Sequence, residues 1–260
     1  MSETMNAWTQ HAYGGPETVM RERVPVPVAG PGQVLVAPTV VGLNSADVRL
    51  MRGEPLLVRV AFGLRRPRQP VPGRDVAGRI LARGAGVTAV AVGDRVVGEL
   101  DGGGLADRVV APADRVGPSP DGVTDTTAAV LPLAGGTAWQ ALDLADIAAG
   151  NRVLVLGAGG GVGTLVVRLA VLRGAEAGVW GPLGRMARGA LLSLGGRRRI
   201  RPLAARTRPE LTAKLLELTA SGQLHPPLSQ TWPVTAAPAA LAAIDAGGVV
   251  GKVAVVAEPA

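Results

Sequence analysis

Apolar and polar residues alternate in two different ways along the chain. In the first 125 residues, short apolar runs such as Gln33–Pro38, Val71–Leu81 and Leu105–Ala111 are separated by turns rich in glycine and proline. Turns at this spacing predict a compact, barrel-like β-rich domain rather than strands joined by crossover helices. Beyond residue 125 the apolar repeats lengthen, which predicts helices alternating with strands.

One strand of this second part runs directly into a glycine-rich turn. Arg152–Leu156 has the pattern of a buried strand, Gly157–Gly163 follows, and the apolar repeat of Thr164–Arg173 predicts a helix. Strand, glycine turn and helix open a dinucleotide-binding unit, because glycines let the backbone approach a pyrophosphate whose charge the helix N-terminus attracts. The candidate cofactor-binding residues of this turn are Gly157, Gly160, Gly161, Val162 and Gly163.

The segments after the turn are too few for a complete unit of this kind. Glu176–Trp180 is a candidate strand, Leu183–Leu194 and Pro209–Ser221 are candidate helices, and Lys252–Val256 is a closing strand. A complete doubly wound sheet has about six strands, with about 30 residues in each β-α-β unit. The pattern therefore predicts a reduced Rossmann-type parallel sheet.

These patterns together predict an α/β protein with two domains. We expect a barrel-like substrate domain at residues 1–125 and about 236–260, and a truncated Rossmann-like domain at residues 126–235. A sheet that lacks strands exposes unpaired edges, which proteins commonly cover by association. We therefore expect a homodimer, formed through the sheet of the shortened domain.

Composition narrows the class of protein. Apolar residues make up 47% of the chain, which argues against global disorder, and cysteine is absent, which excludes a disulfide framework. The net charge of +7 comes from arginine, and its densest run, Arg197–Arg199, has no aromatic residue nearby. That arrangement argues against a nucleic-acid partner. Neither a membrane span nor a signal peptide is predicted, so we expect a cytoplasmic protein without a membrane partner.

Six motifs in a fixed order resemble the medium-chain dehydrogenase/reductase superfamily, and within it the zinc-independent quinone oxidoreductases. Each motif is weak alone, and their order makes the resemblance specific. The motifs are Tyr13–Glu17, Gly42–Asp47, Pro72–Gly78, Val92–Val96, Leu131–Leu142 and Gly157–Gly163.

The chain departs from this family after its second Rossmann-type strand. In the family, further β-α units precede a segment similar to Gly181–Leu194, whereas here Gly174–Ala177 passes almost directly into it. The resemblance implies NADPH as the cofactor, yet the piece that would supply its ribose-phosphate site is missing. An NADP site calls for a cation about 20 positions past the turn, and Arg185 is the nearby charge.

A catalytic zinc is not expected. Zinc-dependent relatives use a cysteine and a Gly-His-Glu segment, and this chain has no cysteine and reads Gly73-Arg74-Asp75 at the second position. The histidines are His11 and His225 alone, so three nitrogen or sulfur ligands are not available.

The resemblance places three uncharged side chains at the substrate and nicotinamide cleft. Tyr13 would donate a hydrogen bond to a carbonyl oxygen, Asn44 would orient that carbonyl, and Thr137 would face the nicotinamide. The alternatives are a packing role for Tyr13, a turn role for Asn44 and interdomain packing for Thr137.

Asp47 and Asp75 are the candidate acid–base groups of the same motifs. An alternative for Asp47 is that it caps a helix at Val48–Arg52. An alternative for Asp75 is an ion pair with Arg74 or Arg79.

Three functions remain open. The first is NADPH-dependent reduction of an enone, quinone or related carbonyl compound, in which hydride passes to the electrophilic carbon. The second is a cofactor-independent cyclase, isomerase or lyase that binds a bulky, polyketide-like substrate in the vacated cleft. The third is a non-catalytic protein that binds a small molecule or acts as a scaffold. The first two require a small-molecule substrate.

Overall fold

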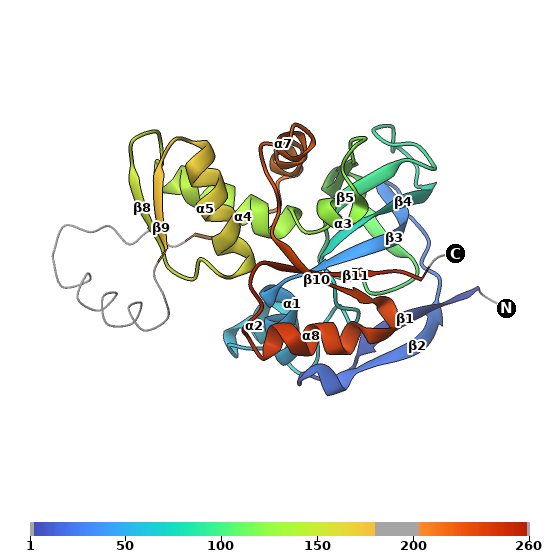
Figure 1. Cartoon of the computed structure of the whole chain (residues 1–260). Coiled ribbons are helices and arrows are strands. Elements are labelled where there is room, and N and C mark those ends of the chain that lie inside the picture. The colour runs from blue at the N-terminus through green and yellow to red at the C-terminus, as the bar shows by residue number, and fades with distance from the viewer. Residues whose placement is uncertain (1–2, 180–202, 259–260) are drawn as a thin grey trace.

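The computed structural model describes residues 3–179 and 203–258, and its architecture is α/β (Figure 1). The expected helix at Leu183–Leu194 and the basic run Arg197–Arg199 lie outside these residues. The strands are β1 (Thr4–Gln10), β2 (Val19–Pro25), β3 (Gln33–Leu43), β4 (Asp75–Arg83), β5 (Arg95–Glu99), β6 (Val109–Pro112), β7 (Val116–Pro118), β8 (Arg152–Val155), β9 (Glu176–Val179), β10 (Leu228–Pro233) and β11 (Lys252–Val256). The α-helices are α1 (Ser45–Arg52), α2 (Leu57–Phe62), α3 (Asp125–Ala128), α4 (Pro132–Leu144), α5 (Gly161–Leu172), α7 (Pro209–Ala220) and α8 (Ala237–Asp245).

Seven strands form one mixed sheet, to which the first part of the chain contributes five strands and the C-terminal part contributes β10 and β11. Its order is β10-β11-β3-β4-β5-β7, with β6 also paired to β3. β10 lies parallel to β11, and the other pairs are antiparallel. The expected β-rich part is present, and within the described residues its sheet runs from an edge at β10 to an edge at β7. β1 and β2 form a separate hairpin, tied to the rest by a bridge between Ala7 and Ala106.

β3 is the central strand and determines where the later elements can approach. It is buried along most of its 11 residues, as expected for a strand covered on both faces. Its pairing with β4 shifts register between Pro38 and Val40, because proline has no N–H to donate to the ladder. At Gly42 a side chain would collide with the carbonyl oxygen of Ala129. Glycine at this position therefore lets the segment between α3 and α4 lie directly against β3.

The second part contains a small parallel sheet. β8 and β9 pair in parallel, and α5 connects them. Figure 1 shows this β8-α5-β9 unit apart from the large sheet, with α4 extending from the large sheet toward α5. α4, α5 and α7 share one apolar cluster that includes Leu142, Leu165 and Leu215. In the described part of the chain, the parallel sheet has these two strands.

Candidate functional site

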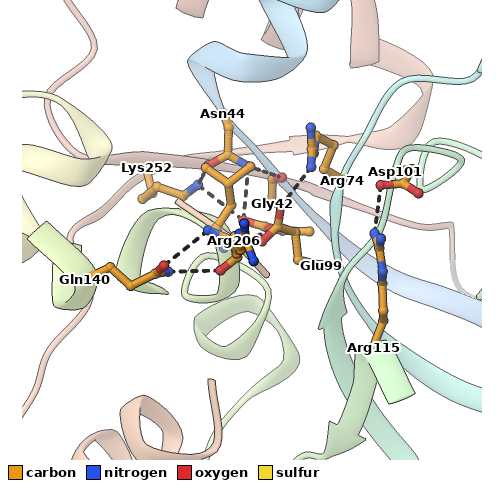
Figure 2. A network of polar contacts seen from close by, with 11 residues as sticks. Gly42, Asn44, Arg74, Glu99, Asp101, Arg115, Gln140, Arg206 and Lys252 are labelled. Carbon is orange, nitrogen blue, oxygen red and sulfur yellow. Dashed lines mark hydrogen bonds and ion pairs between the residues drawn. The ribbon is translucent and has the colours of Figure 1, made fainter. Parts of the chain in front are cut away.

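A buried polar cluster lies where β3, β4 and β11 meet. Asn44 follows β3, Asp75 begins β4 and Lys252 begins β11. The Asn44 amide nitrogen donates to an Asp75 carboxylate oxygen at 3.0 Å, and the Lys252 ammonium donates to the Asn44 side-chain oxygen and, at 3.1 Å, to the Leu43 carbonyl (Figure 2). Lys252 and Asp75 form an ion pair at 3.7 Å, with both side chains at 2% exposure or less. The cluster is thus a closed network in which each charge has a partner.

The close approach at Gly42 also supplies a contact from α4. With the α3–α4 segment against β3, the backbone N–H of Leu133 in the first turn of α4 donates to the second Asp75 oxygen at 3.1 Å. A carboxylate at a helix N-terminus is stabilised by the helix dipole and by N–H groups that lack an intrahelical acceptor. Asp75 therefore connects the large sheet to α4.

Burial controls the protonation of this cluster. It raises the pKa of Asp75 to about 7, although the Lys252 charge and the Asn44 hydrogen bond oppose this increase. Burial lowers the pKa of Lys252, and the nearby Asp75 and Asp47 carboxylates oppose that decrease. The protonation of Asp75 is therefore sensitive to pH near neutrality.

Asp47 lies beside the cluster and serves α1. Its carboxylate accepts a hydrogen bond from the backbone N–H of Asn44 at 2.8 Å, as in a capping box. Burial raises the pKa of Asp47, and that hydrogen bond and the Arg74 charge oppose the effect. The position supports the capping interpretation of the sequence. Asp47 is also among the residues that line the larger cavity described below.

Arg74 borders two cavities. It is held by Glu99, whose carboxylate accepts from the guanidinium at 2.8 Å (Figure 2). The larger cavity, of about 360 Å³, is mainly apolar, with Leu50, Met51 and Phe62 among its lining residues. The smaller cavity, of about 180 Å³, is lined by Arg74, Glu99, Thr137, Arg206, Arg208 and the first turn of α4. Asn44 is almost fully buried and occupied by internal contacts, so Arg74 is the more available polar group.

Tyr13 stands apart from the Asn44 cluster. Its hydroxyl donates to the carbonyl of Gly63 at 2.5 Å, and the Arg59 guanidinium lies over its ring at 4.6 Å. These contacts connect the start of the chain to the segment after α1, in agreement with the packing alternative. The structure therefore brings Asn44, Asp47 and Asp75 together, and it places Thr137 near Arg74 on the smaller cavity.

The glycine turn has the form of a pyrophosphate cradle. Gly157 has φ = 78°, and a side chain at Gly163 would collide with the Gly157 carbonyl, so both positions favour glycine. Gly160 is the N-cap of α5 and supplies no side-chain cap, which leaves the first N–H groups of the helix for an external acceptor. Gly160 is exposed and open to solvent. The described part of the site therefore fits a phosphate group.

The same turn contacts the strand that carries Lys252. The Gly251 N–H donates to the Gly159 carbonyl at 2.8 Å, and the methylene groups of Lys252 lie against Gly161. β11 thus joins the phosphate cradle to the buried cluster. The positions about 20 residues past the turn, where a contact with the ribose phosphate is expected, include Trp180 and Arg185 and lie outside the described residues.

The residues present do not fit a catalytic zinc ion. The second ligand position of zinc-dependent relatives is occupied by Arg74, a permanent cation that binds Glu99. Within residues 3–179 and 203–258, no group of three or more His, Asp or Glu side chains gathers in a way that could hold a metal ion.

Lys252 and Arg74 are the site residues that the sequence interpretation did not select. Lys252 is one of two lysines in an arginine-rich chain and follows a glycine at the start of a strand. Those signals were available, but its contact with Asn44 depends on the register of β11 beside β3, in which Val253 opposes Leu43. Arg74 stood out as the replacement of a histidine ligand and as an alternative ion-pair partner of Asp75, but in the structure Arg74 pairs with Glu99, and Asp75 pairs with Lys252.

Comparisons with known proteins agree with this geometry. A family profile described as an alcohol dehydrogenase GroES-like domain matches residues 30–121, and one described as zinc-binding dehydrogenase matches residues 113–255, more than half of the chain. A quinone oxidoreductase from Coxiella burnetii superposes with a TM-score of 0.87 at 21% identity, covering 98% of this chain and 100% of that one. The chain belongs to the medium-chain dehydrogenase/reductase family, and its fold is similar to that of quinone oxidoreductases, as the motifs indicated.

Curated relatives match over part of their length. A mycocerosic acid synthase-like polyketide synthase from Mycobacterium tuberculosis is 40% identical over 156 residues, which are 60% of this chain and 7% of the synthase. A 2-methylene-furan-3-one reductase from Solanum lycopersicum is 35% identical over 176 residues, 64% of this chain and 44% of the reductase. The chain thus spans less than half of each of these relatives. In its described residues, no helix is long and apolar enough to cross a membrane.

Proposed function

We propose that this protein reduces an α,β-unsaturated ketone or quinone with NADPH. One observation carries the proposal: the open, uncapped phosphate cradle at α5 is held against β11, whose Lys252 anchors Asn44 and Asp75. The proposed nucleotide site and the buried polar cluster are therefore connected through Gly251 and β11. The similarity to an enone reductase over 64% of the chain supports the same reaction class.

The residues of the cradle would hold the nucleotide. The N–H groups of Gly161, Val162 and Gly163 would bind the pyrophosphate, and Gly157 and Gly160 would leave room for it. Thr137 would contact the nicotinamide end. When bound, the cofactor supplies a hydride to the β-carbon of the substrate, while the α-carbon takes a proton from water.

Arg74 would stabilise the charge that develops on the substrate oxygen. A guanidinium stays protonated, so Arg74 acts as an electrostatic partner of the enolate and not as the proton donor. Glu99 binds its guanidinium, and the mainly apolar cavity beside it would take the hydrocarbon part of the substrate. The buried Lys252–Asp75 pair positions Asn44 and α4 around this site.

A cofactor-independent reaction is the second candidate. It is favoured by the small extent of the parallel sheet, which has two strands, β8 and β9, in the described part of the chain. A bulky substrate would then occupy the cleft and be cyclised or isomerised by orientation.

Anaerobic oxidation of NADPH by simple enones and quinones tests the proposal. We expect absorbance at the nicotinamide band to fall with stoichiometric formation of the saturated ketone from an enone, or of the hydroquinone from a quinone. Arg74→Gln should lower kcat by about 10²-fold, the usual loss on removal of one oxyanion partner, while the dissociation constant of NADPH changes little. Arg115→Gln is the matched control, because Arg115 forms an exposed pair with Asp101. Failure of the wild-type protein to oxidise NADPH with any acceptor would contradict the proposal.

A further inference from the structure

The smaller cavity beside Arg74 combines several groups that attract an anion. We propose that it binds the carboxylate group of the substrate, so that the substrate class is an unsaturated oxo acid. This inference rests on the proposed function, because it names the substrate class of the same site. The experiment at its end separates the two claims.

Positive charge exceeds negative charge in this cavity. Arg74, Arg206 and Arg208 line it, against the single carboxylate of Glu99. Glu99 is already bound to Arg74 at 2.8 Å, and the Arg206 guanidinium has no carboxylate partner in the described part of the chain. Arg208 forms only a distant, half-exposed pair with Glu210 at 4.0 Å. A carboxylate in the cavity would therefore find two cations that are not committed elsewhere.

The segment that carries Arg206 is fixed to α4. The Gln140 side chain donates to the Arg206 carbonyl at 2.9 Å and accepts from its backbone N–H at 3.1 Å (Figure 2). These two bonds join positions 66 residues apart and involve the backbone of Arg206. The guanidinium is thus brought to the cavity without being used for the attachment.

Arg74 itself has a donor without a partner. Its Nε atom is buried and has no hydrogen-bond partner among the described residues, and Arg74 borders both this cavity and the larger one. A buried donor without a partner costs free energy unless a ligand or water satisfies it. The first turn of α4 also lines the cavity, but Pro132 has no N–H and the Leu133 N–H already donates to Asp75, so the polar side chain that this helix adds is Thr137, one turn further on. Guanidinium and carboxylate groups match in planar, bidentate pairs.

The size of the cavity selects the group that enters it. A volume of about 180 Å³ accommodates a carboxylate and a few attached atoms. The larger, mainly apolar cavity that Arg74 also borders, of about 360 Å³, suits the hydrocarbon part of a substrate. A substrate with an acid at one end, an enone next to it and an apolar tail would place its carbonyl group near Arg74. The arginine would then contact both oxygen functions of such a molecule.

The test uses 4-oxonon-2-enoic acid and its methyl ester as matched probes. Binding of each to the full chain is measured by calorimetry without nucleotide, and reduction is measured with NADPH. We expect the acid to bind at least about tenfold more tightly than the ester, as charge-assisted hydrogen bonds imply. Arg206→Gln/Arg208→Gln should abolish this preference and leave ester binding unchanged. The Lys/Lys double variant should retain part of it, and Arg23→Gln, on exposed β2, should retain all of it.

The outcomes separate the two proposals. Equal binding of acid and ester, or a preference that survives in the Gln/Gln variant, would overturn the anion site even if both probes are reduced. Loss of NADPH affinity in that variant, with the acid preference intact, would also overturn it and would assign the arginines to the nucleotide. Tight, arginine-dependent binding of the acid without reduction would support the anion site and contradict the reductase.

Discussion

Asp75 and Lys252 show how single residues shape this site. Both side chains are buried, and burial shifts the pKa of each in the direction that favours its neutral form. The charge of each residue opposes that shift in the other. Buried pairs of this kind contribute little net stability, but removal of one member leaves an uncompensated charge. Their main effect here is to fix Asn44 and the start of α4.

The stability of the protein should depend on Asp75 in a defined pH range. Because the folded-state pKa of Asp75 is raised to about 7 from 3.8, the folded state binds more protons than the unfolded state between these values. Its contribution to the free energy of unfolding is complete below about pH 4 and is lost as the pH rises through about 7. Lys252, with its lowered pKa, has the opposite effect at alkaline pH.

Urea unfolding at pH 4.5 to 8 measures this effect. The free energy of unfolding of the wild type, relative to Asp75→Asn, should fall across this interval, whereas the difference from the exposed Asp121→Asn control should stay constant. If the free energy of unfolding of the wild type rose with pH relative to that of Asp75→Asn, the pKa of Asp75 would be lowered in the folded state and not raised.

Individual site residues could be predicted from the sequence only where a motif carried them. Asn44, Asp47 and Asp75 came from two ordered motifs, and the structure brings them together. Lys252 is more than 200 positions from Asn44, and its role depends on strand register, which no local pattern reveals. Whether these residues act on a substrate stays a prediction.

At the scale of elements, the β8–turn–α5 unit is the clearest feature. Gly160 has extended backbone angles, φ −76° and ψ 166°, which an aspartate or asparagine N-cap also adopts. An added side chain there would approach the Gly157 carbonyl at 3.5 Å, which is ordinary contact. The position can therefore be changed without breaking the turn.

Gly160→Asp should separate stability from nucleotide binding. The aspartate caps α5 and should stabilise the fold by about 0.5–1 kcal/mol, while its charge faces the pyrophosphate and should abolish NADPH binding. Gly160→Asn provides the cap without the charge and should bind NADPH more tightly than the Asp variant. Thermal unfolding and fluorescence titration report the two effects, and normal NADPH binding by a folded Gly160→Asp protein would refute the assignment of this turn to the pyrophosphate.

Element types could be predicted better than their ends. The expected strand at Val71–Leu81 begins at Asp75, because Pro72 and the positive φ of Gly73 (93°) keep the preceding residues out of the ladder. α5 begins at Gly161 and not at Thr164. Its first turn contains glycines, and their low helix propensity is the reason why the sequence pattern placed the start of the helix after them. In both cases a glycine at the start of the element separates the predicted boundary from the observed one.

At the scale of the whole molecule, the small parallel sheet leaves one apolar surface exposed. Val153 of β8 packs against the apolar cluster of α4, α5 and α7 and Val155 is buried, so the alternating Leu154 points to the opposite face, where it is 42% exposed. Leu156 is also exposed, at 55%. We expect this face to lie in a homodimer.

Light scattering tests the homodimer. The wild type should have twice the mass of the chain at micromolar concentration, and Leu154→Lys should shift it toward the monomer. Val92→Lys, at an exposed turn far from β8 in the sequence, is the matched control. A monomeric wild type would contradict this prediction.

The α/β class and the family could be predicted from the sequence, because ordered motifs cover most of the chain. The strand order of the large sheet could not be predicted, since it depends on pairing between distant strands. β10, which the proposed domain boundary at residue 235 assigns to the second domain, pairs with β11 in the large sheet. The division into two domains remains a proposal.

Titration of the full chain with NADPH tests the central claim most directly. Nicotinamide fluorescence or calorimetry should give a saturable isotherm with about one nucleotide per chain and a dissociation constant on the order of micromolar. The signal should disappear in Gly160→Asp and persist in Arg23→Gln. Absence of binding by the wild type at millimolar NADPH would contradict the account and leave the cofactor-independent reaction in its place.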